Sequence, residues 1–138
     1  MKVDEIKDSL ARDVREPWLH VCHQVVDEMA RRRPVELFRL TYMMIAGFVG
    51  RSAEDEILQS AITTLTTHRH HPLTMYYVFL DVADDREIAI SSSDVMQSVD
   101  ENVFIHPRTG EEVADFADLI RPVFKASGEF LDGIRQNG

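Results

Sequence analysis

The change of hydrophobic period between residues 52 and 90 constrains the fold more than any other part of this chain. Apolar side chains recur at helical spacing from Ala53 to Leu65. After a polar, histidine-rich segment the pattern becomes an apolar and aromatic run, Met75–Val82, and a second short run follows at 87–90. Two short runs joined by an aspartate-rich connection are typical of a β-hairpin. The sequence therefore predicts a helix followed directly by a hairpin.

The start of that helix is predicted at Ser52. A serine hydroxyl can accept hydrogen bonds from the unpaired N–H groups of a first turn. The acidic residues Glu54, Asp55 and Glu56 follow, where the helix dipole favours negative charge.

Three helices are predicted before Ser52. Val3, Ile6, Leu10 and Val14 indicate a short amphipathic helix at the N-terminus. Pro17 is suited to the first position of a second helix, because a proline has no N–H to leave unpaired there. An apolar stripe runs along this second helix: Trp18, Cys22, Val25, Val26 and Met29. The third helix, 35–48, is apolar nearly all round from Tyr42, which is typical of a helix at the centre of a fold.

Smaller elements follow the hairpin. The segment 91–94 is predicted to cap a short helix, and residues 103–110 to form a second, smaller hairpin with Gly110 in its turn. The last clear helix is predicted at 113–124, with a kink at Pro122. The predicted fold class is therefore helix-rich α+β: about five helices with one or two β-hairpins, in a single domain of residues 1–138. The termini, 1–14 and 128–138, are expected to be frayed or docked.

Composition limits the class of protein. A chain of 138 residues with 44% hydrophobic residues can bury a core without disulfides, and its single cysteine, Cys22, cannot form one internally. The N-terminus is too polar for a signal peptide, and the most apolar stretch, 40–49, is about half the length that crosses a bilayer. We therefore expect a soluble, cytoplasmic protein without membrane contact. Its net charge of −9 works against nucleic acid as a partner.

The order of elements from Val35 to Ile90 resembles that of a winged helix: a helix, a glycine-containing turn, a capped helix and a hairpin. In that fold the second helix lies in the major groove of DNA. Here the beginning of that helix carries Glu54, Asp55 and Glu56, which phosphates would repel, and the hairpin is also acidic. A winged-helix DNA-binding transcriptional regulator is therefore an alternative, and an acidic interaction module is the preferred reading of this topology.

The arginine triplet Arg31, Arg32 and Arg33 is the densest basic patch. It could contact phosphate or RNA. It also follows a predicted helix, where cations complement the exposed carbonyl groups. We favour this second interpretation.

The histidines suggest a second alternative, a small metal-binding enzyme. His20 and His23 are three residues apart on a helix, and His68, His70 and His71 form a cluster. Zinc sites usually repeat a ligand spacing or contain a His-Glu-x-x-His pattern, and neither occurs here. We therefore expect no metal and no cofactor. The cluster could instead sense pH, because the net charge would change from −9 to −3 if all six histidines were protonated.

Reactive side chains are not set against one another in the sequence. Cys22 belongs to an apolar stripe, where its thiolate would be disfavoured. The serines at 91–93 lack a nucleophile-elbow motif, and the acidic pairs at 84–85 and 111–112 lie in turns that are expected to be solvated. No catalytic residue is predicted.

The preferred function is a non-catalytic protein-interaction or regulatory module that acts through a surface. The partner is expected to be another protein, and a homodimer through the hairpin or the tail (Phe130, Leu131, Ile134) is a further prediction. The residues predicted for the interaction surface are His68, His70, His71, Tyr76, Arg31, Arg32 and Arg33.

Overall fold

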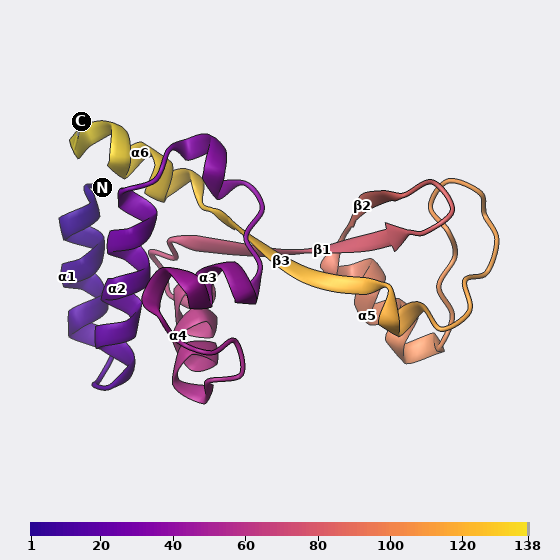
Figure 1. Ribbon diagram of the computed structural model, residues 1–138, viewed down its shortest axis with the longest axis horizontal. Helices are drawn as coiled ribbons and strands as arrows, with labels where there is room; N and C mark the ends of the chain where they lie inside the picture. The colour runs from indigo at the N-terminus through magenta and orange to yellow at the C-terminus, as the bar shows by residue number, and fades with distance from the viewer. Residues whose placement is uncertain (138) are drawn as a thin grey trace. The chain divides into compact units, whose positions relative to one another are not determined.

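The structure is a computed structural model that describes residues 1–137, with side chains through residue 135. Within the described residues the chain forms six α-helices, two short 3₁₀ helices and one three-stranded sheet (Figure 1). The predicted helix-rich α+β class is confirmed. The chain divides into two compact units: unit 1 contains residues 1–75 and the segment from Phe124 onward, and unit 2 is the segment Tyr76–Val123. That the whole chain is one domain stays a prediction.

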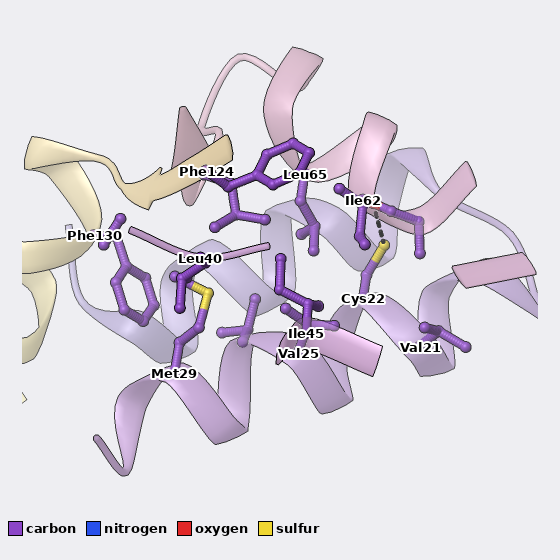
Figure 2. Close-up of a cluster of buried hydrophobic side chains, with 14 of the residues drawn as sticks. Val21, Cys22, Val25, Met29, Leu40, Ile45, Ile62, Leu65, Phe124 and Phe130 are labelled. Carbon is purple, nitrogen blue, oxygen red and sulfur yellow. Dashed lines mark hydrogen bonds between the residues drawn. The ribbon is translucent and has the colours of Figure 1, made fainter. Parts of the chain in front are cut away.

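Unit 1 is mainly helical. It contains α1 (Val3–Asp13), α2 (Trp18–Ala30), α3 (Tyr42–Val49), α4 (Glu56–Thr67) and α6 (Gly128–Asn137). Helices α1 and α2 lie side by side (Figure 1), and α2 also packs against α3 and α4. Figure 2 shows the resulting core, in which Val25 of α2 lies near Ile45, and Met29 lies near Leu40 and Phe130. Of the predicted apolar stripe of α2, Cys22, Val25, Val26 and Met29 are fully buried, whereas Trp18 is only half-buried.

Helix α4 begins later than predicted. Its N-cap is Asp55, whose Oδ1 accepts the backbone N–H groups of Ile57 (2.8 Å) and Leu58 (3.2 Å). Ser52 lies in the preceding turn and accepts only the N–H of Glu54. The prediction of Ser52 as the cap was wrong, because the carboxylate of Asp55, three residues later, accepts the N–H groups of the first helical turn and brings a charge that the helix dipole favours.

The predicted third helix, 35–48, is interrupted. A 3₁₀ helix, η1 (Pro34–Leu37), is followed by extended backbone in which Leu40 exchanges two hydrogen bonds with Phe124 (2.7 and 2.8 Å). Thr41 then caps α3 by accepting the N–H of Met44, and Gly50 ends it with φ +68°. Backbone pairing at Leu40 thus replaces a helical turn. The expected central position is also wrong, because Met43 on α3 is 78% exposed.

The sheet is formed by β1 (Leu73–Asp81), β2 (Arg86–Ile90) and β3 (Ile120–Ala126) in the order β2-β1-β3. The predicted hairpin is confirmed: β1 and β2 are antiparallel, from Tyr77 opposite Ile90 to Asp81 opposite Arg86. The predicted helix at 113–124 was wrong, since this region forms the 3₁₀ helix η2 (Phe116–Asp118) and then β3. Pro122 does not kink a helix but lies in an outer strand, where a missing N–H is tolerated.

Unit 2 has its own hydrophobic cluster of Phe79, Ile90, Phe104 and Phe116, supplied by the hairpin and the loops after α5 (Ser92–Glu101). Ser91 caps α5 as predicted, by accepting the N–H of Asp94. The second hairpin predicted at 103–110 is reduced to a single bridge between Ile105 and Glu112, with Gly110 at φ +75° in the turn.

The two ends of the chain are docked in unit 1. Val3, Ile6 and Leu10 of α1 are buried, and so is Phe130 of α6. Leu131 and Ile134 also pack against the core, so the predicted tail is a helix with an apolar face inside the protein. Within the described residues, every helix is too short or too polar to span a bilayer.

Candidate functional site

The negative charge of the protein is concentrated in unit 2. This segment carries eleven aspartates and glutamates against three arginines, a net charge of −8 with histidines neutral. The rest of the chain carries thirteen acids against twelve lysines and arginines, a net charge of −1. Ten of the eleven acids in unit 2 are exposed, and Asp81 is the buried one. Unit 2 is therefore an acidic surface, whereas unit 1 is nearly neutral.

Apolar side chains are exposed among these acids. Val82, Met96, Val99 and Ile105 are each more than half exposed. Most exposed apolar side chains occur singly and need no explanation, but acids and apolar groups together are typical of interaction surfaces.

An open groove of about 300 Å³ lies beside α5 in unit 2. Its apolar part comes from Ile90, Val103, Phe104, Ile105 and Pro107, and α5 supplies Asp94, Gln97, Ser98 and Glu101. The four helical residues lie at positions i, i+3, i+4 and i+7, which share one face of a helix. The groove thus combines an apolar wall, from the end of β2 and the loop after α5, with a polar, acidic wall from α5.

A histidine–aspartate pair lies inside unit 2. The Nε2 atom of His106 is 3.1 Å from Oδ2 of Asp81, and both side chains are largely buried. The Nδ1 atom of His106 accepts the backbone N–H groups of Arg108 (3.1 Å) and Thr109 (3.2 Å). Because Nδ1 is an acceptor, the proton lies on Nε2 and is donated to Asp81. Both ring nitrogens are used, so this pair holds a loop in place and offers no free base.

The pKa of Asp81 reflects the same contacts. Burial acts to raise the pKa of this carboxyl. The hydrogen bond from His106 and the backbone N–H groups of Asp84 and Ala83 outweigh burial, so the pKa is lowered overall. Asp81 is therefore an ionised acceptor inside unit 2.

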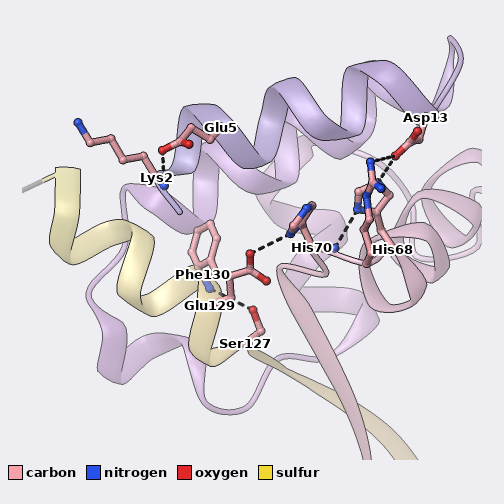
Figure 3. A network of polar contacts seen from close by, with 9 residues as sticks. Lys2, Glu5, Asp13, His68, His70, Ser127, Glu129 and Phe130 are labelled. Carbon is pink, nitrogen blue, oxygen red and sulfur yellow. Dashed lines mark hydrogen bonds and ion pairs between the residues drawn. The ribbon is translucent and has the colours of Figure 1, made fainter.

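The histidines of the predicted cluster form hydrogen bonds within unit 1 (Figure 3). Nδ1 of His68 accepts the backbone N–H of His70 (3.1 Å), and Nε2 lies 2.7 Å from Oδ2 of Asp13 at the end of α1. The His68 hydrogen bond is the largest cause of a lowered pKa for Asp13, against a smaller opposing effect of burial, and the charge of Arg69 adds to the lowering. These contacts fasten the end of α4 to the end of α1.

The other two histidines of the cluster are also engaged. Nδ1 of His70 is 3.0 Å from Glu129 of α6, and Nδ1 of His71 is 3.1 Å from the carbonyl oxygen of Leu73. The fourth residue predicted for this surface, Tyr76, is half-buried in β1 and belongs to unit 2. Through His68 and His70 the cluster thus connects the end of α4 and the segment after it with α1 and α6 in unit 1.

The arginine triplet is divided among three environments. Arg31 forms an ion pair with Glu28, and Arg33 forms one with Glu36; the partners in each pair are three residues apart in the sequence. The guanidinium of Arg32 lies 4.0 Å from the centre of the Phe48 ring, a cation–π contact. Among the described residues, no hydrogen bond or ion pair joins the triplet to the histidine cluster.

The remaining candidates for chemistry are separated or buried. Among the described residues, no three histidine, cysteine, aspartate or glutamate side chains are arranged to hold a metal ion. His23 is hydrogen-bonded to the carbonyl oxygen of Lys7, whereas His20 is exposed. Burial raises the pKa of the Cys22 thiol to about 12, so it is a neutral core side chain near the carbonyl oxygen of Ala61.

Comparison with known proteins adds nothing to these observations. No family model, curated protein or solved structure matches this chain.

The sequence reasoning identified acidity but did not place it. A count of the charged residues from Tyr76 to Val123 would have found the charge difference between the two units. The groove could not be found in this way, because Ile90 ends β2 and Ile105 lies in the loop after α5, and only the fold of unit 2 brings both beside α5.

Proposed function

We propose that this protein is a non-catalytic protein-interaction module, and that the acidic surface of unit 2 binds a basic surface of another protein. The observation that carries the proposal is the division of charge, −8 in unit 2 against −1 in the rest. A surface of one sign attracts partners of the opposite sign and raises their association rate.

The exposed apolar side chains support a protein partner. Complementary charge mainly sets the rate and specificity of association, whereas buried apolar groups usually supply much of the affinity. Unit 2 presents both kinds of group, with Val99 65% and Ile105 51% exposed among the acids. A simple counter-ion or a basic polymer would make no use of the apolar ones.

A winged-helix DNA-binding regulator is less well supported. Glu54 and Glu56 are exposed at the beginning of α4, where a groove-reading helix would face phosphates. The hairpin that would be the wing belongs to unit 2 and shares its negative charge.

The proposal is tested by affinity capture with the full chain from an extract of its source organism, followed by binding of the purified partner. The first variant neutralises three exposed acids of unit 2, Asp100→Asn, Asp115→Asn and Asp118→Asn. The matched control neutralises three exposed acids of unit 1, Asp4→Asn, Asp8→Asn and Glu54→Gln. We expect the purified partner to bind the control like the wild type, and to bind the unit 2 variant at least about tenfold more weakly at 50 mM salt.

Salt provides the second readout. Binding should weaken as salt rises from 50 to 200 mM, because charges more than about 10 Å apart are largely screened at 0.1 M. Equal loss in the two variants, or capture only of nuclease-sensitive material, would contradict the proposal. The second result would favour the DNA-binding alternative.

A further inference from the structure

We propose that the groove beside α5 is the binding site for a basic peptide segment of the partner, which inserts one apolar side chain between lysines or arginines. This inference rests on the proposed function and specifies its contact site. The segment is identified by chemistry alone: an apolar anchor residue flanked by positive charges.

The shape and lining of the groove fit a single side chain. Ile90, Val103, Phe104, Ile105 and Pro107 provide the apolar wall of a space of about 300 Å³. This volume lies at the lower end of the range for binding pockets, so it fits an anchor residue better than a large cofactor. Ile105 is 51% exposed, and an anchor in the groove would remove part of its apolar surface from water.

The charges along the groove fit a basic segment. Asp94 and Glu101 lie on the same face of α5. They are seven residues apart, which corresponds to about 10 Å along the helix axis. Among the described residues neither has a lysine or arginine partner, and Gln97 donates to Oε1 of Glu101 (3.2 Å). Two carboxylates that have no cationic partner and lie beside an apolar wall can therefore receive positive groups on either side of one apolar side chain.

The groove also differs from the rest of the acidic surface. Met96, Val99 and Asp100 are exposed on α5 but do not line the groove. General acidity predicts equal roles for all exposed acids of α5, whereas the groove predicts a specific role for Glu101. This difference supplies matched control variants on the same helix.

The test uses full-length, isotope-labelled protein and three synthetic decapeptides. The first carries four lysines around a central leucine, the second replaces the leucine with serine, and the third replaces the lysines with glutamates. Amide shifts in NMR titrations report where each peptide binds, and how tightly.

We expect the lysine–leucine peptide to shift the amides of Ile90, Ser98 and Ile105, and to bind about tenfold more tightly than the serine peptide. Ile105→Ser should weaken binding of the leucine peptide several-fold, whereas Val99→Ser, which removes an exposed apolar group outside the groove, should not. Glu101→Gln should weaken binding more than Asp100→Asn does. The amide spectrum of each variant shows whether unit 2 is still folded, and Glu101→Gln leaves the apolar wall intact.

Four outcomes would count against the proposals. Equal binding of the leucine and serine peptides, or leucine-peptide shifts that avoid the groove, would overturn the groove proposal and leave the acidic surface as the binding site. Equal binding of the lysine and glutamate peptides would overturn the proposed function itself. A loss of binding in Val99→Ser as large as in Ile105→Ser would also count against the groove.

Discussion

Gly133 sets how closely α6 approaches the N-terminus of the chain. A Cβ atom at this position would lie 2.6 Å from the carbonyl oxygen of Met1 and 3.4 Å from the backbone nitrogen of Val3. Both neighbours are backbone atoms, which cannot move aside as a flexible side chain can. The close packing of α1 and α6 therefore depends on the absence of a side chain at one position.

Gly133→Ala is expected to destabilise the protein by about 1–3 kcal/mol, the usual cost of overpacking. Thermal unfolding followed by circular dichroism measures this change. Gly128→Ala is the control, because no atom lies within 4 Å of the position where its Cβ would be. A Gly133 variant as stable as the Gly128 variant would show that α6 can move away from α1 without cost.

Asp13 is expected to make the free energy of unfolding depend on pH in the acidic range. Its pKa is lowered in the folded protein, mainly by the hydrogen bond from His68, so the ionised carboxylate stabilises the fold above its ordinary pKa. This stabilisation is lost as pH falls through the lowered folded-state pKa. Asp13→Asn should therefore be less stable than the wild type at pH 6, and the difference should shrink below about pH 4.

The melting temperatures of both proteins between pH 6 and 2 measure this convergence. Asp8→Asn is the matched control: it removes one exposed carboxylate from the same helix, where among the described residues no side-chain partner is found. A constant difference between Asp13→Asn and the wild type across the whole range would mean that the carboxylate is not the titrating group.

At the scale of elements, the cap of α4 provides a direct comparison of two positions. Asp55 accepts two N–H groups of the first turn of α4, whereas Ser52 accepts one N–H in the preceding turn. Asp55→Ala should cost about 0.5–2 kcal/mol, and Ser52→Ala clearly less. Urea unfolding of the two variants measures the difference. Asp55→Asn should recover most of the loss, since an amide oxygen can accept the same bonds; equal costs at both positions would restore Ser52 as the cap.

Local patterns predicted elements well where neighbouring residues decide them. The hairpin from Tyr77 to Ile90 was predicted because its strands pair with each other across a short turn. Strand β3 was missed because its apolar residues also fit a helical period, and because its partner, β1, lies about forty residues earlier. The break at Leu40 was missed for the same reason, since it depends on pairing with Phe124.

The candidate site divides in the same way. The overall acidity of the chain was readable from its residue types. The role of His106 was not, because its partner Asp81 is twenty-five residues away and its other nitrogen is occupied by the backbone of its own turn. The histidines were predicted as a surface, yet His68 and His70 contact acids on α1 and α6 that no local pattern could identify.

At the scale of the whole molecule, the two units have cores of very different size. The cluster of unit 1 contains twenty buried residues, whereas the cluster of unit 2 contains four, Phe79, Ile90, Phe104 and Phe116. Regions with less buried apolar surface open at lower free energy. Unit 2 is therefore expected to open before unit 1 does.

Native-state hydrogen exchange tests this expectation. The amides of Phe79 and Ile88 should exchange faster, and with a lower opening free energy, than those of Val25 and Ile62. Phe104→Ala should cost unit 2 about 3–5 kcal/mol, and so raise exchange there while leaving the amides of α2 and α4 nearly unchanged. Equal protection of all four amides in the wild type would mean that the protein unfolds as one cooperative body.

The path of the chain through the sheet has a consequence for how such a protein can change. The chain passes from unit 1 into unit 2 within β1 and returns to unit 1 within the neighbouring strand β3, so unit 2 is one uninterrupted segment that begins and ends in adjacent strands. A tight turn of about two to five residues could join those strands directly. The acidic segment could thus be replaced by a segment of another length and charge. Such a replacement would give the protein a new specificity without redesigning the core of unit 1.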